Sequence, residues 1–173
     1  LILAYSSILN GGKKIDIKLL QNEKNRKSNQ VISNETSIYI NKLLRAVVLE
    51  TEYTGPRVKI EGYNIGGKTG TAELINSEGK YQEDANRTLF VGAFPMNDPQ
   101  FLILTVINNP KKIKEENYNI TGAAVNAPLV KKIILRMIEI LDIPKQKKTD
   151  FLNAATTVIY NESHAINWYN QTY

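Results

Sequence analysis

The 173-residue chain contains no cysteine, a single histidine and a single tryptophan. Without cysteine it can form no disulfide framework, no thiolate metal site and no thiol nucleophile. An isolated histidine such as His164 is more often structural or solvent-exposed than catalytic, because catalytic histidines act with a partner. We therefore assign His164 no role, and we predict neither a bound metal nor a cofactor.

The sequence also lacks a long hydrophobic run. No apolar stretch approaches the roughly 18 residues that are needed to cross a bilayer. The opening segment 1–5 is too short, and no basic stretch precedes it as in a signal peptide. Because the chain begins without methionine, on residues typical of the middle of a helix, we expect it to be a piece of a longer protein.

The net charge of +5 is concentrated near the C-terminal end. Residues 111–148 contain 9 Lys and Arg against 4 Asp and Glu. Such a basic segment can bind nucleic acid or an anionic surface. The helix expected there carries no aromatic residues between its charges, which favours a solvated helix face. We predict no nucleic-acid partner.

The first half of the chain has the pattern of two helices. Residues 1–10 resemble a helix end closed by Asn10-Gly11-Gly12, since glycine permits a left-handed stop. A polar connector follows as far as Gln30. Ser33 or Asn34 is then expected to cap a second helix. Its apolar stripe comprises Ile40, Leu43, Leu44, Val47 and Val48.

Three strands are expected after residue 54, where the hydrophobic period changes. The first includes residues 65–71 and is followed by a turn at 76–79 and a polar stretch at 81–86. The second runs over about 87–94, with Thr88, Phe90 and Phe94 on one face. The third, residues 101–107, is nearly all apolar, and we therefore expect a central strand that is buried on both faces.

A long helix closes the predicted fold. Asn126 is a plausible cap with Pro128 in the first turn, and Pro144 ends the helix. The apolar stripe comprises Leu129, Val130, Ile133, Ile134, Met137 and Leu141. The fold class is therefore α+β, an antiparallel sheet covered by helices. We predict a folded unit over residues 1–144 and a polar tail over 145–173.

The most informative segment reads Gly66-Gly67-Lys68-Thr69-Gly70-Thr71-Ala72-Glu73. A Lys-Thr-Gly motif forms one wall of the active site in penicillin-recognising enzymes. The ammonium of Lys68 suits a point-charge contact with a substrate carboxylate. Thr69 and Thr71 offer hydroxyls to the same carboxylate, and Gly70 lets the substrate backbone lie against the strand. The simpler reading of Lys68 is an edge-strand lysine that blocks aggregation.

Other segments extend the match in the same order. The chain resembles the transpeptidase domain of class B penicillin-binding proteins, most closely the cell-division enzyme. The resemblance covers roughly residues 1–144, and a collinear match of this kind is far more specific than one motif. The matching segments are Ala4-Tyr5-Ser6-Ser7-Ile8-Leu9-Asn10-Gly11-Gly12, residues 31–48, Thr54-Gly55, Gly62-Tyr63, Phe90-Val91-Gly92-Ala93-Phe94-Pro95 and Ala127-Pro128.

This resemblance implies the C-terminal portion of the penicillin-binding transpeptidase or serine β-lactamase-like fold. It implies a peptidoglycan D,D-transpeptidase that binds stem peptides ending in D-Ala-D-Ala and reacts with β-lactams. It assigns Lys68 and Thr71 as catalytic, with the Thr71 backbone N–H in the oxyanion hole, and Thr69, Gly70 and Thr71 as substrate-binding. The expected location is the periplasmic side of the inner membrane, with an anchoring helix upstream. Expected partners are the upstream part of the same domain and the cell-division glycosyltransferase machinery.

The family also needs Ser-x-x-Lys and Ser-x-Asn motifs, and neither occurs here in credible form. Ser77-Glu78-Gly79-Lys80 matches the letters of the first, but it lies in a predicted turn rather than at the start of a buried helix. Tyr39-Ile40-Asn41 resembles a variant of the second, yet it lies in the middle of a predicted helix. We therefore expect the chain to contain no nucleophile and to be inactive alone.

Two other functions remain open on the sequence. The chain could be a non-catalytic remnant or a binding module that a partner protein holds. It could also derive from a serine β-lactamase or a β-lactam sensor, which share the Lys-Thr-Gly strand. The Gly62-Tyr63 and Ala127-Pro128 segments speak against the latter.

Overall fold

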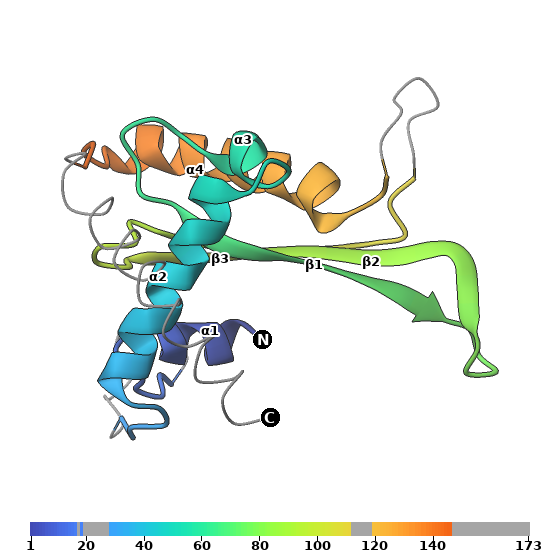
Figure 1. Cartoon of the computed structure of the whole chain (residues 1–173), viewed down its shortest axis with the longest axis horizontal. Coiled ribbons are helices and arrows are strands. Elements are labelled where there is room, and N and C mark those ends of the chain that lie inside the picture. Colours follow the sequence, from blue (N-terminus) through green and yellow to red (C-terminus); the bar gives the residue numbers. More distant parts are fainter. Residues whose placement is uncertain (17, 19–27, 112–118, 147–173) are drawn as a thin grey trace, which may run out of the picture.

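Helices pack on both sides of a small antiparallel sheet, in agreement with the α+β prediction (Figure 1). The computed structural model describes residues 1–16, 18, 28–111 and 119–146. No helix in these ranges is both long and apolar enough to span a bilayer. The elements are α1 (Ile2–Leu9), α2 (Asn34–Glu50), α3 (Gly55–Val58), β1 (Gly66–Ile75), β2 (Tyr81–Phe94), β3 (Phe101–Asn108) and α4 (Gly122–Leu141).

The order of strands in the sheet is β1-β2-β3, so β2 is the central strand. The prediction that residues 101–107 form the central strand is therefore wrong for this part of the chain. β3 pairs with β2 on one side only, and its residues are half-buried or exposed, with Val106 48% exposed. An apolar run indicates that a strand is buried. Whether the strand is central or at an edge depends on which other strands pair with it.

The β1–β2 hairpin is longer than predicted. β2 begins at Tyr81, opposite Ile75, whereas the sequence indicated a start at Arg87. The predicted turn is confirmed: the side-chain oxygen of Asn76 accepts hydrogen bonds from two backbone N–H groups, and Gly79 has a φ of +78°. The polar pairs near the turn extend the hairpin beyond the helices that cover the rest of the sheet (Figure 1).

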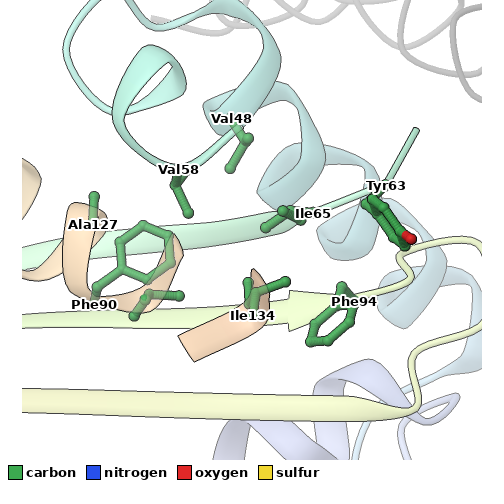
Figure 2. Close-up of a cluster of buried hydrophobic side chains, with 9 residues drawn as sticks. Val48, Val58, Tyr63, Ile65, Phe90, Phe94, Ala127 and Ile134 are labelled. Carbon is green, nitrogen blue, oxygen red and sulfur yellow. The ribbon is translucent and has the colours of Figure 1, made fainter. Parts of the chain in front are cut away.

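α4 covers one face of the sheet and forms the main core there. Phe90 and Phe94 of β2 point into this core together with Ile134 of α4, and all three side chains are fully buried (Figure 2). The prediction that Thr88, Phe90 and Phe94 share a face agrees with this arrangement. The buried cluster comprises Val48, Val58, Tyr63, Ile65, Phe90, Phe94, Ala127, Val130 and Ile134.

α2 crosses the end of the sheet where β1 begins. Its cap is Ser33, whose hydroxyl accepts a hydrogen bond from the N–H of Thr36, as predicted. Leu44 packs in a second cluster with Leu9 of α1, and Val48 lies in the main core. Leu43, predicted to lie on the apolar stripe, is 37% exposed.

α4 begins earlier than predicted. Its N-cap is Thr121, whose hydroxyl accepts from the N–H of Ala124, so Asn126 is not the cap and Pro128 is not in the first turn. Asn126 is instead fully buried, and its amide nitrogen donates to the carbonyl and hydroxyl oxygens of Thr105 on β3. The helix ends at Asp142 in a left-handed conformation, before Pro144.

Two of the six predicted stripe positions on α4 are exposed, Leu129 at 37% and Leu141 at 52%. Beyond the helix, the N–H of Gln146 donates to the carbonyl oxygen of Gly62, and its side-chain oxygen accepts from the N–H of Asn64. The division at 144/145 stays a prediction, because most of the proposed tail, including His164, lies outside the described residues.

Candidate active site

The Lys-Thr-Gly motif lies in the first half of β1, on an edge of the sheet. Lys68 is opposite Val91, Gly70 is opposite Leu89 and Thr71 is opposite Thr88. The Lys68 side chain is exposed, and its ammonium donates to the carbonyl oxygen of Thr69 at 3.2 Å. An exposed lysine on an edge strand fits both interpretations of Lys68, the residue that blocks aggregation and the residue that binds a substrate carboxylate. The position of Lys68 alone does not distinguish them.

The side chains of the motif leave the strand on two different faces. Successive residues in a strand alternate, so Lys68 lies on one face while Thr69 and Thr71 lie on the other. The register agrees, because Thr69 is opposite Phe90, which points into the α4 core. A single carboxylate can therefore meet the ammonium and the threonine hydroxyls together only along the free edge of β1.

Thr71 has a second neighbour that the sequence does not reveal. Its hydroxyl oxygen accepts a hydrogen bond from the N–H of Gly122 at 3.0 Å, which ties β1 to the start of α4. The Thr71 side chain is nevertheless exposed.

The two glycines before Lys68 have a packing role. A Cβ on Gly67 would lie 2.6 Å from the ring of Phe90, and one on Gly66 would lie 2.7 Å from the sulfur of Met96. Real Cβ atoms do not approach other atoms so closely, so larger residues would push β1 away from the core. These glycines fix the depth at which the strand that carries Lys68 sits.

Arg45 was not identified from the sequence, because a buried charged residue on α2 was not expected beside the apolar residues Leu44 and Val48. It is only 6% exposed, and its guanidinium donates to the carbonyl oxygen of Ile65 at 2.6 Å and to the side-chain oxygen of Asn64 at 3.2 Å. Burial lowers the pKa of Arg45 to about 10, so it stays charged at neutral pH. It anchors the segment that leads into β1 directly before the motif.

Ser77 lies in the turn between β1 and β2, not at the start of a helix. The turn is exposed, and the ammonium of Lys80 lies 3.3 Å from the carboxylate of Glu78. A nucleophilic serine needs an adjacent base held in a protected site. Tyr39-Ile40-Asn41 lies in the middle of α2. Ser77 is therefore in an exposed turn and Tyr39-Ile40-Asn41 is within a helix, the settings that the sequence predicted for them.

The described residues form one wall rather than an enclosed site. A cavity of about 590 Å³ lies between α1, α2 and the β2–β3 turn, and its lining includes Ser37, Asn41 and Pro99. Another of about 390 Å³ lies beside Arg45 and Tyr63. The motif residues line neither of them.

Comparison with known proteins identifies the family of the chain that carries this motif. Residues 1–135 match the penicillin-binding protein transpeptidase domain. The chain belongs to this family. The Lys-Thr-Gly segment at residues 68–70 lies within the matched range.

Curated members of the penicillin-binding transpeptidase family agree. The chain is 40% identical over 123 residues to the peptidoglycan D,D-transpeptidase FtsI homolog of Chlorokybus atmophyticus, a match that covers 70% of the chain and 16% of that protein. It is 37% identical over 118 residues to the stage V sporulation protein D of Bacillus subtilis, covering 68% of the chain and 17% of that protein. The chain thus spans about a sixth of the length of these relatives.

Solved structures of the family share the fold. Penicillin-binding protein 3 of Mycobacterium tuberculosis, complexed with aztreonam, matches with a TM-score of 0.70 and 25% identity over 84% of this chain and 35% of that one. The transpeptidase domain of Burkholderia pseudomallei penicillin-binding protein 3 matches with a TM-score of 0.69 and 23% identity, over 84% of this chain and 43% of that one. The sheet and its helices are therefore those of the penicillin-binding transpeptidase fold.

Proposed function

We propose that the chain supplies the Lys-Thr-Gly wall of a peptidoglycan D,D-transpeptidase that cross-links stem peptides during cell division. The observation that carries this proposal is the motif on the free edge of β1, within a chain that matches the transpeptidase family over residues 1–135. Among the relatives are proteins named peptidoglycan D,D-transpeptidase FtsI, and one structural neighbour is complexed with aztreonam.

The reaction consists of two acyl transfers. A serine hydroxyl attacks the carbonyl carbon of the penultimate D-Ala and forms an ester with it. The C–N bond breaks, and the terminal D-Ala takes up the serine proton and leaves as the free amine. An amine of a neighbouring strand then attacks the ester, a new amide bond forms, and the serine recovers its proton. Covalent catalysis of this kind divides one difficult step into two easier ones. A β-lactam enters only the first step, and its opened ring stays attached to the serine.

In this scheme the chain binds and stabilises but does not attack. Lys68 places a positive charge beside the terminal carboxylate of the stem peptide, or beside the ring carboxylate of a β-lactam. Thr69 and Thr71 donate hydroxyl protons along the same strand edge, and Gly70 lets the substrate backbone approach. The backbone N–H of Thr71 is the oxyanion donor on this wall. Losing such a donor lowers rates by about 10²–10³.

The nucleophile comes from the rest of the domain, which precedes this chain. Two features support that partner: the sequence holds no credible Ser-x-x-Lys or Ser-x-Asn motif, and β3 is an apolar strand with one edge unpaired among the described residues. We call the chain together with that upstream part the complete domain. We further propose that it acts on the periplasmic side of the inner membrane, held by an upstream helix and working beside the division glycosyltransferase.

The test compares lysines in the complete domain. Lys68→Ala should lower the rate of covalent labelling by a fluorescent penicillin at least a hundredfold, while the melting temperature stays within a few degrees, because the side chain is exposed. Lys80→Ala is the matched control on the same hairpin, since its ion pair with Glu78 is solvent-exposed. Thr71→Val should lose less than Lys68→Ala, because its backbone N–H survives.

Each outcome of this test bears on one function. Equal labelling by the Lys68→Ala and Lys80→Ala proteins would refute the assignment of Lys68. Hydrolytic turnover of the penicillin, rather than stable labelling, would favour a β-lactamase. A complete domain that is well folded but never labelled would favour the non-catalytic binding module.

A further inference from the structure

The N-terminus of α4 approaches the motif strand more closely than a side chain would allow. Gly122, the first residue of the helix, is buried against β1 and β2. A Cβ at this position would collide with the carbonyl oxygen of Leu89 and would lie 2.8 Å from the carbonyl oxygen and 3.2 Å from the nitrogen of Gly70. These are backbone atoms, which cannot rotate away as the end of a side chain can. Only glycine lets the helix start here.

The close approach is accompanied by one specific hydrogen bond. The first N–H groups of a helix have no partner within it. Thr121 satisfies one of them locally, by accepting from the N–H of Ala124 at 3.2 Å. The N–H of Gly122 is satisfied from another element, by the hydroxyl oxygen of Thr71 at 3.0 Å. A motif residue thus serves as a distant cap for α4.

This bond determines what the Thr71 hydroxyl can offer to a ligand. A hydroxyl has one proton and two acceptor lone pairs. The Gly122 N–H occupies one lone pair, so the O–H proton and one lone pair remain to be directed elsewhere. Within residues 1–16, 18, 28–111 and 119–146 this proton has no acceptor: the hydroxyl of Thr88, directly opposite Thr71, is buried and makes no hydrogen bond there. A carboxylate only accepts, so it is the complementary ligand.

We propose that Gly122 is a positioning residue for the transpeptidase site: it holds the Thr71 hydroxyl so that its proton is directed to the substrate carboxylate at the free edge of β1. This inference rests on the proposed function. Gly122 itself touches no substrate. The close packing of Gly122 against Gly70 sets the position of its N–H, and Gly122 acts on the site through the bond from that N–H to the Thr71 hydroxyl.

The matched control is another buried glycine with the same kind of constraint. Gly55, at the start of α3, is buried, and a Cβ there would lie 2.6 Å from the carbonyl oxygen of Val48. Gly55→Ala therefore adds the same methyl group against a backbone oxygen, away from the motif strand. Gly122→Ala and Gly55→Ala should both lower the melting temperature of the complete domain. Only Gly122→Ala should also slow acylation.

The experiment measures the second-order rate constant for acylation of the complete domain by a fluorescent penicillin. Gly122→Ala should lower it between roughly ten- and a hundredfold, as expected for a displaced contact group. In a Thr71→Val background the same change should cause no further loss, because the hydroxyl through which Gly122 acts is gone. Thr71→Ser retains the hydroxyl and should acylate at close to the normal rate.

Thr121→Ala adds no atoms, so it tests the proposal even if the Gly122→Ala protein does not fold. Thr121→Ala removes the local cap and loosens the first turn of α4, so it should slow acylation in the normal background and not in Thr71→Val. Equal acylation by Gly122→Ala and Gly55→Ala proteins, or a Gly122→Ala effect that simply adds to that of Thr71→Val, would overturn the proposal. If Lys68→Ala leaves acylation unchanged, the proposed function itself fails, which is a distinguishable result.

Discussion

Replacement of Arg45 by methionine gives the sharpest test of how the motif strand is held. Methionine keeps the length of the side chain and removes its charge and its five donors. The two hydrogen bonds that Arg45 donates, to Ile65 at 2.6 Å and to Asn64 at 3.2 Å, disappear. Both acceptors lie immediately before β1, so the change acts on the start of the strand that carries Lys68.

The expected magnitude is a difference of two larger effects. A hydrogen bond that involves a charged group contributes about 1.5–3 kcal/mol, so the two together contribute roughly 3–6 kcal/mol. Against this stands the cost of removing the guanidinium from water, the same burial that lowers the pKa of Arg45 to about 10. Methionine removes both terms. We therefore expect Arg45→Met to lower the free energy of unfolding of the complete domain by about 1–2 kcal/mol, and Arg45→Ala to cost more through the cavity it leaves.

Urea denaturation followed by circular dichroism measures this difference. Lys42→Met on the same helix is the matched control, because it makes the same kind of change without a buried guanidinium and should stay within about 0.5 kcal/mol of the unchanged domain. Arg45→Met should also slow penicillin acylation, because the entry to β1 loosens. An Arg45→Met domain as stable as the control, with unchanged acylation, would refute the anchoring role.

Further predictions concern the core, the sheet and the chain on its own. Phe90→Ala should lower the free energy of unfolding of the complete domain by about 3–5 kcal/mol in urea denaturation, since its ring is fully buried, whereas the exposed Lys132→Glu should change it by less than about 0.5 kcal/mol. In the isolated chain, Val91→Asp should abolish the circular dichroism of the fold, while Leu104→Asp, on the neighbouring edge strand, should be tolerated better. The reverse order would contradict β2 as the central strand. The isolated chain should self-associate in size-exclusion chromatography through the open edge of β3 and should not label with penicillin. Covalent labelling mapped to Ser77 would overturn the assignment of the nucleophile to the upstream part.

Local chemistry was enough to predict several parts of the fold. Ser33 could be assigned as a cap because its hydroxyl satisfies an N–H only three residues away. The turn at 76–79 was equally readable, since asparagine and glycine specify such turns through their own backbone contacts. The alternation in the second strand placed Phe90 and Phe94 on one buried face. The α+β class and the motif strand follow from such short-range signals.

Predictions were less accurate where a segment makes contacts with residues far away in the sequence. The apolar sequence of β3 indicates that the strand is suited to burial. It does not indicate which strands pair with β3, because those strands come from other parts of the sequence. The start of α4 was misplaced because Asn126 and Pro128 fit a helix start, whereas Asn126 is buried by its contact with Thr105 of β3. A residue can satisfy a local rule and still be used for a distant contact.

The sequence by itself determined that this chain carries a Lys-Thr-Gly strand in a mixed helix and sheet fold. Only the tertiary structure decided how that strand is supported. The burial of Arg45 against Ile65 and the contact of Gly122 with Thr71 join residues that are 20 and 51 positions apart. No local periodicity encodes such contacts, because they depend on how α2 and α4 pack against the sheet. For the same reason, the motif could be read from eight consecutive residues, while the groups that hold it in place could not.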